Sequence, residues 1–150
     1  MKIAIAEAQK GIAKKHGGPF GAVIVKDRKI IAQAHNEVLI TNDPTAHAEV
    51  NVIRKATKKL RRFDLSDCIL YTSCEPCPMC LGAIAWARIP HIYYGCTRYD
   101  AEQIGFSDKE IYDLLQEKQT KPMVKKKPLM RKECNTVFAK WSAQENKKMY

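Results

Sequence analysis

The stretch DCILYTSCEPCPMCLGAIAWARIPHIYYGC, residues 67–96, decides the fold class. Its two ends, DCILYTS and HIYYGC, are short apolar runs rich in β-forming residues, and they predict buried strands. Between them, a run of helix-forming apolar residues predicts a helix from about 77 to 87. A strand, a helix and a second strand in succession are typical of a sheet covered by helices.

The residues before this stretch predict another helix and a hairpin. Residues 2–16 carry apolar side chains at helical spacing and are followed by Gly17, Gly18 and Pro19, which end a helix. Two apolar runs, 20–25 and 29–35, are separated by an Asp-Arg pair and predict a β-hairpin. Because the chain has both a hairpin and strand-helix-strand crossovers, its sheet must be mixed.

Further helices are expected on both sides of the central stretch. The Asp-Pro pair at 43–44 supplies a cap and a first-turn proline for a helix from about 44 to 59. Later helices are predicted at 107–118 and 131–146, with KPMVKKKP at 121–128 as an edge strand between them. The prediction is an α/β chain whose 150 residues form a single domain, with one mixed sheet between helices.

The composition is typical of a globular protein. Hydrophobic residues make up 45% of the chain and charged residues 28%. The N-terminus lacks the continuous apolar core of a signal peptide, and no run of about 18 apolar residues exists to span a membrane. We therefore expect a cytoplasmic protein without a membrane segment.

The net charge of +10 raises the question of nucleic-acid binding. The basic clusters are dispersed, however. KKLRR at 58–62 follows a predicted helix, where cations interact favourably with the helix dipole, and KKK at 125–127 lies in a proline-flanked segment. A solvated basic surface accounts for this charge, so nucleic acid is not the expected partner.

Six cysteines are present, and their spacing argues against a disulfide framework. Three of them crowd into CEPCPMC, a density that favours metal binding in a reducing compartment. The remaining thiols stand apart and are expected to act as small buried hydrophobic groups: Cys68, Cys96 and Cys134.

Two of the clustered cysteines have metal-ligand spacing. Cys77 and Cys80 are three positions apart, which places two thiols on one face of a helical turn, and prolines suit the start of that helix. With His47 they make a Cys₂His set for tetrahedral zinc that leaves the fourth position to water. Such a water has a pKa of roughly 7 and provides hydroxide at neutral pH.

Glu49 is the candidate that moves protons for this water, because it follows the ligand His47 by two positions. In a regular helix two positions differ by about 200° around the axis. Both side chains can therefore face the metal only where the helix is distorted or where it begins.

Other interpretations of the cysteines and histidines stay open. Cys74 forms a second C-x-x-C with Cys77, so a closed Cys₃His structural zinc site is the main alternative, and a redox dithiol is a weaker one. The remaining histidines are expected to be structural or on the surface: His16, His35 and His91.

HAE at 47–49 followed by PCPMC at 76–80 matches the H-x-E…P-C-x-x-C signature of zinc deaminases. The chain resembles the cytidine deaminase superfamily and, within it, the bacterial guanine deaminases. The resemblance extends over most of the chain and is least faithful at about 113–132. Its segments are GGPFGAVIVKD, HN, NDPTAHAEV, ILYTSCEPCPMCLGAI, WAR, GFSD with IY shortly after, and a terminal Tyr.

This resemblance implies a fold, a cofactor and a reaction. The fold is a three-layer α/β/α arrangement with a five-stranded mixed sheet. His47, Cys77 and Cys80 would hold one Zn²⁺ per subunit. The reaction would be the hydrolytic deamination of guanine to xanthine and ammonia, in purine catabolism or salvage. Zinc-bound hydroxide would attack the amino-bearing ring carbon, with Glu49 as the proton shuttle.

The resemblance also implies the groups that bind the base. Asn36 and Asp108 would form hydrogen bonds with it, Ala48 would contribute its backbone, Phe20 and Trp86 would wall the pocket, and Tyr150 would close over it. Such enzymes are homodimers in which the C-terminal segment, here about 131–150, can be exchanged between subunits. From the residues alone, turn, cap, core and chain-terminus roles are equally available to these side chains.

Three other functions remain possible at the level of sequence. A tRNA adenosine deaminase shares the zinc signature and would suit the basic charge, although such enzymes lack this GFSD and the terminal Tyr. A deaminase of another aminopurine or amino-heterocycle has the same core. The third is a non-catalytic zinc module that binds nucleic acid.

Overall fold

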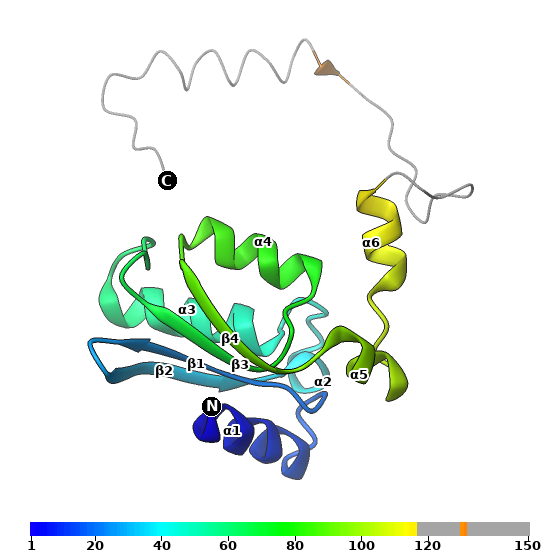
Figure 1. The fold of residues 1–150 in the computed structure, drawn as a ribbon, viewed down its shortest axis with the longest axis horizontal. Coiled ribbons are helices and arrows are strands. Elements are labelled where there is room, and N and C mark those ends of the chain that lie inside the picture. The colour runs from blue at the N-terminus through cyan, green and yellow to red at the C-terminus, as the bar shows by residue number, and fades with distance from the viewer. Residues whose placement is uncertain (117–129, 132–150) are drawn as a thin grey trace.

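One mixed sheet lies at the centre of the structure, a computed structural model that describes residues 1–116, 130 and 131. Within these residues the sheet has four strands in the order β2-β1-β3-β4 (Figure 1). β1 is antiparallel to both of its neighbours, whereas β3 and β4 are parallel. The strands are β1 Gly21–Lys26, β2 Lys29–His35, β3 Ile69–Cys74 and β4 His91–Cys96.

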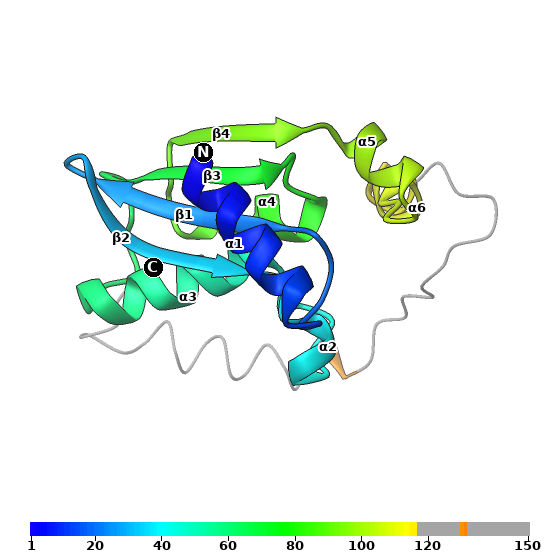
Figure 2. The same ribbon diagram turned by 90° about the horizontal axis from the view of Figure 1, so that it is seen from below.

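Helices cover both faces of this sheet. α1 (Lys2–Ala13) and α3 (Ala48–Leu60) both contact β1 and β2 but from opposite sides, and α4 (Pro78–Trp86) lies beside α3 (Figures 1 and 2). α1 packs closely on β1 at Gly21, where an added Cβ would lie 2.2 Å from the Ala4 carbonyl oxygen. The three-layer α/β/α arrangement is therefore confirmed.

The expected hairpin forms at the expected place. Asp27 and Arg28 connect β1 to β2, and both have positive φ, 48° and 61°. Two successive residues with positive φ make the type I′ turn, whose twist matches that of the paired strands. The hairpin brings the end of β2 to the same edge of the molecule as the start of β1.

The core lies between the sheet and the α3 and α4 layer. Ile24 and Leu70 from the strands pack with Val52 and Ile84 from the helices. Side chains alternate in burial along β3, and the same inward face carries Thr72, which is fully buried. A hydroxyl in that position needs a hydrogen-bond partner, and α3 supplies one, as the site shows.

The helix predicted for 44–59 begins later than expected. His47 is its N-cap and Ala48 its first residue. The Asp43 carboxylate instead accepts hydrogen bonds from the Thr45 backbone N–H at 2.8 Å and the Thr45 hydroxyl at 2.6 Å. Because Asp readily forms such local turns, the Asp-Pro pair ends the preceding loop and does not start the helix.

Three short helices lie beyond the sheet. α6 (Lys109–Leu115) falls within the predicted 107–118, whereas α2 (Val38–Thr41) and α5 (Arg98–Gln103) were not predicted. Both missed helices are too short for hydrophobic periodicity to reveal. α5 and α6 lie beyond the C-terminal ends of β3 and β4, beside the site (Figure 1).

The predicted edge strand at 121–128 and the predicted helix at 131–146 fall outside the described residues, apart from Arg131. The fifth strand implied by the resemblance is not among the four strands of the described part of the chain. In that part, no helix has the length and apolar character needed to cross a membrane.

Candidate metal centre and pocket

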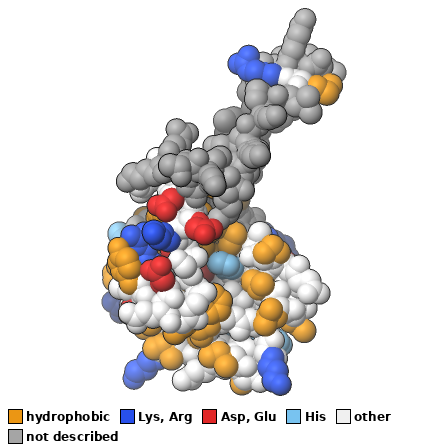
Figure 3. Space-filling view, turned by 90° about the vertical axis from the view of Figure 1, so that its right-hand side faces the viewer, with side chains coloured by type: hydrophobic (Ala, Val, Ile, Leu, Met, Phe, Trp, Pro, Cys, Tyr) orange, Lys and Arg blue, Asp and Glu red, His pale blue; other side chains and the backbone are white. Residues whose placement is uncertain are grey.

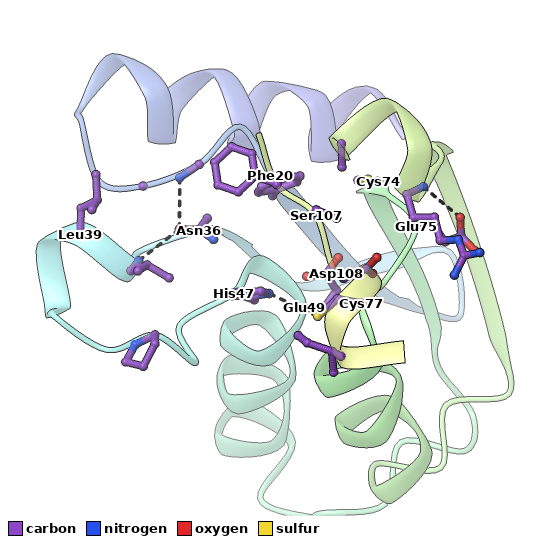
Figure 4. Close-up of a pocket in the computed structure, with 18 residues that line it drawn as sticks. Phe20, Asn36, Leu39, His47, Glu49, Cys74, Glu75, Cys77, Ser107 and Asp108 are labelled. Carbon is purple, nitrogen blue, oxygen red and sulfur yellow. Dashed lines mark hydrogen bonds between the residues drawn. The ribbon is translucent and has the colours of Figure 1, made fainter. Parts of the chain in front are cut away.

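Three metal-ligand side chains meet where two helices begin. His47 is the N-cap of α3, Cys77 is the N-cap of α4, and Cys80 lies in the first turn of α4. The His47 Nδ1 atom is 3.6 Å from the Cys77 Sγ atom (Figure 4). It is 3.5 Å from the Cys80 Sγ atom. Residues 30 or more positions apart in the sequence are thus brought together by the packing of α3 against α4.

These distances fit zinc. With Zn–S bonds of about 2.3 Å and Zn–N bonds of about 2.05 Å, a tetrahedral ion separates its sulfur and nitrogen ligands by about 3.6 Å. The donor atoms of His47, Cys77 and Cys80 all lie within 4.8 Å of one another. The donor set and its spacing therefore match a three-ligand zinc site.

Local electrostatics favour a thiolate at Cys77. A hydrogen bond with Cys80 lowers the pKa of Cys77 to about 4, and the His47 ring acts in the same direction against the effect of burial. The same contact raises the pKa of Cys80. The hydrogen bond with Cys77 also raises the pKa of His47. Cys77 is therefore the first of the two thiols to ionise, as expected at a helix N-terminus.

Glu49 faces the cluster because the helix has just begun. His47 has extended backbone dihedrals, φ −69° and ψ 156°, so it lies outside the regular helix and the 200° offset does not apply. The Glu49 carboxylate is 4% exposed, and its Oε2 atom is 3.4 Å from the Cys80 Sγ atom. The terminal turn that the sequence required is present.

Thr72 holds the Glu49 carboxylate from the other side. Its hydroxyl donates a hydrogen bond of 2.6 Å to the Glu49 Oε1 atom. Burial raises the pKa of Glu49, and this hydrogen bond only partly offsets the effect. A carboxyl group with a raised pKa is suited to exchanging protons near neutral pH.

A cavity of about 470 Å³ opens in front of His47 and Glu49 (Figure 4). Its size falls in the range of roughly 300 to 1,000 Å³ that is common for small-molecule sites. On this side of the molecule, hydrophobic and acidic side chains lie close together (Figure 3). The opposite wall of the cavity is formed by residues from the connections between elements, including Asn36, Phe106 and Asp108.

Asn36 presents its amide nitrogen to this cavity. Its Oδ1 atom accepts hydrogen bonds from the backbone N–H groups of Gly18 and Val38, both at 3.2 Å. The side-chain oxygen is therefore occupied, and the NH₂ group remains as a donor. A Cβ atom at Gly17 would lie 2.0 Å from the same oxygen, so glycine is needed there.

Asp108 also lines the cavity. It is the N-cap of α6, yet its side chain makes no cap hydrogen bond within the described residues. Its carboxylate is therefore not committed to the helix. Burial is the largest cause that raises the pKa of Asp108, and the nearby Cys77 adds to it.

Phe20 forms part of the wall as expected, with a partner that we did not predict. Its ring packs edge-on against Phe106 with a centroid separation of 5.0 Å and an interplanar angle of 86°. Phe106 belongs to the GFSD segment, so the signal for it was already visible in the sequence. Thr72 was also missed; its signal is a hydroxyl residue that shares the alternating, inward-facing positions of β3 with Leu70 and Cys74.

Comparison with known proteins agrees with this geometry. Residues 1–96 match the protein-family model of the cytidine and deoxycytidylate deaminase zinc-binding region. The chain belongs to this deaminase family. His47, Cys77 and Cys80 are its candidate zinc site.

Individual relatives extend the likeness over the whole deaminase chain. A guanine deaminase of Bacillus subtilis is 50% identical over 153 residues, covering 100% of this chain and 96% of its own. The X-ray structure of guanine deaminase from Bacillus subtilis superposes with a TM-score of 0.94 at 48% identity, covering 99% of this chain and 95% of that one. A tRNA-specific adenosine deaminase of Buchnera aphidicola is 35% identical over 140 residues, which is 93% of this chain and 89% of its own.

The remaining cysteine of the CEPCPMC segment, Cys74, is not part of the deaminase metal cluster. Cys74 is buried at the end of β3, and its thiol lies 3.6 Å from the Thr97 carbonyl oxygen. Burial raises the pKa of Cys74 to about 12, which keeps it a neutral thiol. Within the part of the chain that the structure describes, the geometry favours the open three-ligand set over a closed Cys₃His site.

Trp86 does not wall the pocket of this deaminase chain, contrary to the expectation. It is the last residue of α4 and is 69% exposed, away from the cavity. Six residues of helix, about 9 Å, separate it from Cys80 at the opposite end. The Ala48 side chain is fully buried in the core, so only its backbone is available to the site. Tyr150 lies outside the described residues.

Proposed function

We propose that this protein is a guanine deaminase, which hydrolyses guanine to xanthine and ammonia. The observation that carries the proposal is the buried Glu49 carboxylate beside the His47, Cys77 and Cys80 cluster, on the floor of a cavity of about 470 Å³. The choice of guanine is supported by the 50% identity to the Bacillus subtilis enzyme over the full chain.

The chemistry requires an activated water and a proton carrier. Zinc, when bound, supplies the first, because it lowers the pKa of a coordinated water to about 7. Glu49 then accepts a proton from the attacking water and transfers it to the neighbouring ring nitrogen. It next takes the remaining proton from the newly attached oxygen, which becomes the carbonyl oxygen of xanthine, and gives this proton to the amino group, which leaves as ammonia. A C–O bond forms and the C–N bond to the amino group breaks.

Asn36 and Asp108 orient the base. The NH₂ group of Asn36 donates to an acceptor on the base, since its oxygen is already occupied by two backbone N–H groups. The Asp108 carboxylate accepts from ring N–H groups, which guanine has at more than one position. Phe20 and Phe106 provide the apolar surface against which the ring packs. The backbone of Ala48, at the first turn of α3, gives a further polar contact.

Ammonia release by the zinc-loaded protein tests this proposal. Guanine, adenine, cytosine, guanosine, cytidine and an anticodon stem-loop RNA are offered in parallel. We expect turnover of guanine alone. Turnover of a different base with none of guanine would contradict the substrate while keeping the reaction class, and no turnover of any compound would contradict an enzymatic role.

A tRNA adenosine deaminase is the second candidate. The specific observations that favour it are the 35% identity to the Buchnera aphidicola enzyme and the net charge of +10. Phosphate contacts would make stem-loop binding fall steeply with salt. Salt-sensitive binding together with turnover of the RNA would support this function over guanine deamination.

We further propose a homodimer. The supporting observation is a pair of exposed aromatic side chains, Trp86 on α4 and Tyr94 on β4, which is the last strand of the sheet among the described residues. Such a surface suits a second copy of the chain. Light scattering should give twice the chain mass, and a monomeric mass at micromolar concentration would exclude it.

Two expectations for the C-terminal segment stay predictions. They are the closure of Tyr150 over the base and the exchange of residues 131–150 between subunits, and both are supported by the sequence resemblance alone. Tyr150→Phe should raise KM for guanine while the metal content stays unchanged. The cytoplasmic location likewise stays a prediction.

A further inference from the structure

A second group of metal-ligand side chains lies on the far side of Asn36. The imidazoles of His16 and His35 and the carboxylate of Glu37 bring one ligand atom each within 4.8 Å of the others. They come from three separate segments: the loop after α1, the last residue of β2 and the N-cap of α2. None of the three lines the pocket.

The contacts of Glu7 fix which nitrogen of His35 is available. The His35 Nδ1 atom is 2.8 Å from the Glu7 Oε2 atom. The Glu7 carboxylate also accepts hydrogen bonds at its Oε1 atom, from Lys10 Nζ at 3.2 Å and from Gln33 Nε2 at 2.9 Å. A carboxylate only accepts hydrogen bonds, so His35 donates through Nδ1 and a neutral ring turns the lone pair of Nε2 toward His16.

His35 and Glu37 each have a hydrogen-bond partner on the atom that would not bind the metal. Glu7 holds the outer nitrogen of His35, and Asn51 donates a hydrogen bond of 3.1 Å to the outer oxygen of Glu37. Carboxylates and amides that orient ligand side chains in this way are the usual surroundings of metal sites. The carboxylates of Glu7 and Glu37 carry two negative charges and Lys10 one positive charge. This net negative charge favours a bound cation.

The distances suit one ion. Two imidazole nitrogens bound at about 2.05 Å to a common metal lie roughly 2.9 to 3.4 Å apart. The His16 Nδ1 and His35 Nε2 atoms are 3.0 Å apart. The Glu37 Oε1 atom is 3.8 Å from the His35 Nε2 atom, and its side chain is partly exposed, so a small rotation brings it to the same ion.

We propose that His16, His35 and Glu37 form a second divalent-metal site, which takes a cation such as Zn²⁺ through two imidazoles and one carboxylate. The site is separate from the His47, Cys77 and Cys80 cluster and does not depend on guanine as the substrate. Such a His₂-carboxylate set leaves positions for water and suits borderline divalent ions.

An ion bound by these three residues would cross-link the two segments that hold Asn36 in the wall of the cavity. His35 and Glu37 flank Asn36 in the sequence, and the His16 carbonyl oxygen accepts hydrogen bonds from the backbone of Leu39 and Ile40. Joining the three ligands therefore fixes the loop after α1 to the start of α2. Both segments hold the Asn36 side chain, through Gly18 and Val38.

Metal counting on the tag-free full-length chain tests the proposal. The chain is stripped with a chelator, dialysed against buffered Zn²⁺ over a range of free concentrations, and its bound metal is measured by mass spectrometry. We expect two equivalents per chain for the wild type and one for His16→Ala. Glu37→Gln should weaken the second equivalent at least tenfold. His91→Ala, which removes an exposed histidine on β4, is the matched control and should keep two.

Cobalt distinguishes the two sites in the same proteins. Co²⁺ bound by thiolates gives intense charge-transfer absorption, whereas Co²⁺ bound by nitrogen and oxygen gives weak bands only. The second equivalent should add weak bands in the wild type and none in His16→Ala, and it should raise Tm in the wild type alone. A single equivalent at every concentration, or two equivalents in His16→Ala, would overturn the site. The cluster would then be a Glu7–His35–His16 hydrogen-bond relay. Neither readout uses guanine turnover. The test of the second metal site is therefore independent of the proposed guanine deaminase reaction.

Discussion

The two walls of the cavity are built differently. His47, Cys77, Cys80 and Glu49 belong to the first turns of α3 and α4 or to their caps, and these helices pack on the sheet. The opposite wall comes from connections and short helices, and Phe106 there is 46% exposed. We infer that the core fixes the reactive groups while the connections select the substrate. Changes to the first wall should therefore alter metal content and kcat, and changes to the second should alter KM and selectivity.

The largest effect is expected at the metal ligands. Cys77→Ser should remove the zinc equivalent held by the His47, Cys77 and Cys80 cluster and abolish turnover, because a hydroxyl is a poor replacement for a thiolate ligand. Cys74→Ser is the matched control, three positions away and outside the cluster, and should keep one equivalent at this site together with turnover. Metal analysis and ammonia release check both. Zinc loss in Cys74→Ser would favour the closed Cys₃His site. It would contradict the inference that the first wall holds an open, three-ligand zinc site.

Glu49→Gln should give the next largest effect. The amide keeps the shape of the side chain but cannot carry the proton, so kcat should fall by about 10² to 10⁴ fold with zinc retained. Steady-state kinetics and metal analysis on the same preparation measure the two quantities. Unchanged kcat would assign the proton transfer to another group and would suit a non-catalytic zinc module.

Asn36→Asp tests the substrate wall. The substitution keeps the oxygen that accepts from Gly18 and Val38, but it replaces the NH₂ donor by a second acceptor. One unpaired polar contact corresponds to about 1 to 3 kcal/mol, so kcat/KM for guanine should fall about 10- to 100-fold, mainly through KM. Zinc content and Tm should stay close to wild type. A loss confined to kcat would show that this residue acts in the chemistry.

Thr72→Val should have the smallest effect of the four substitutions. Thr72 is a positioning residue, since it touches Glu49 and not the cavity. Removing its hydroxyl leaves the carboxylate with one hydrogen bond fewer, and kcat should fall by about tenfold with KM and zinc unchanged. Thr72→Ser restores the donor and should recover most of kcat. An unaffected kcat would mean that packing alone orients Glu49.

Much of the fold could be predicted because the strands and α4 are continuous apolar runs bounded by turn-forming or polar residues. The hairpin at Asp27 and Arg28 and helix α4 were placed within one or two residues. Errors arose where local chemistry has two outcomes. Asp43 was expected to cap a helix but closes a turn with Thr45, and both are ordinary uses of an aspartate before proline.

The two aromatic residues that were predicted to wall the pocket show the same limit. Phe20 lies in the wall, whereas Trp86 lies at the exposed end of α4. Both are large apolar residues in segments that carry the family resemblance, and nothing in their spacing states which of them faces the cavity. Phe106, in the GFSD segment, takes the place next to Phe20 that sequence alone could not assign.

The sequence by itself determined the chemistry of this protein: the His-x-Glu and Cys-x-x-Cys spacings select the zinc ligands and the proton carrier, because donor type and local spacing are written in the chain. Only the tertiary structure decided where those groups meet and what else faces them. It begins α3 at Ala48, so that His47 and Glu49 point the same way, and it brings Thr72 to Glu49 and His16 to His35. Such contacts depend on the packing of segments distant in the sequence, which no local pattern encodes.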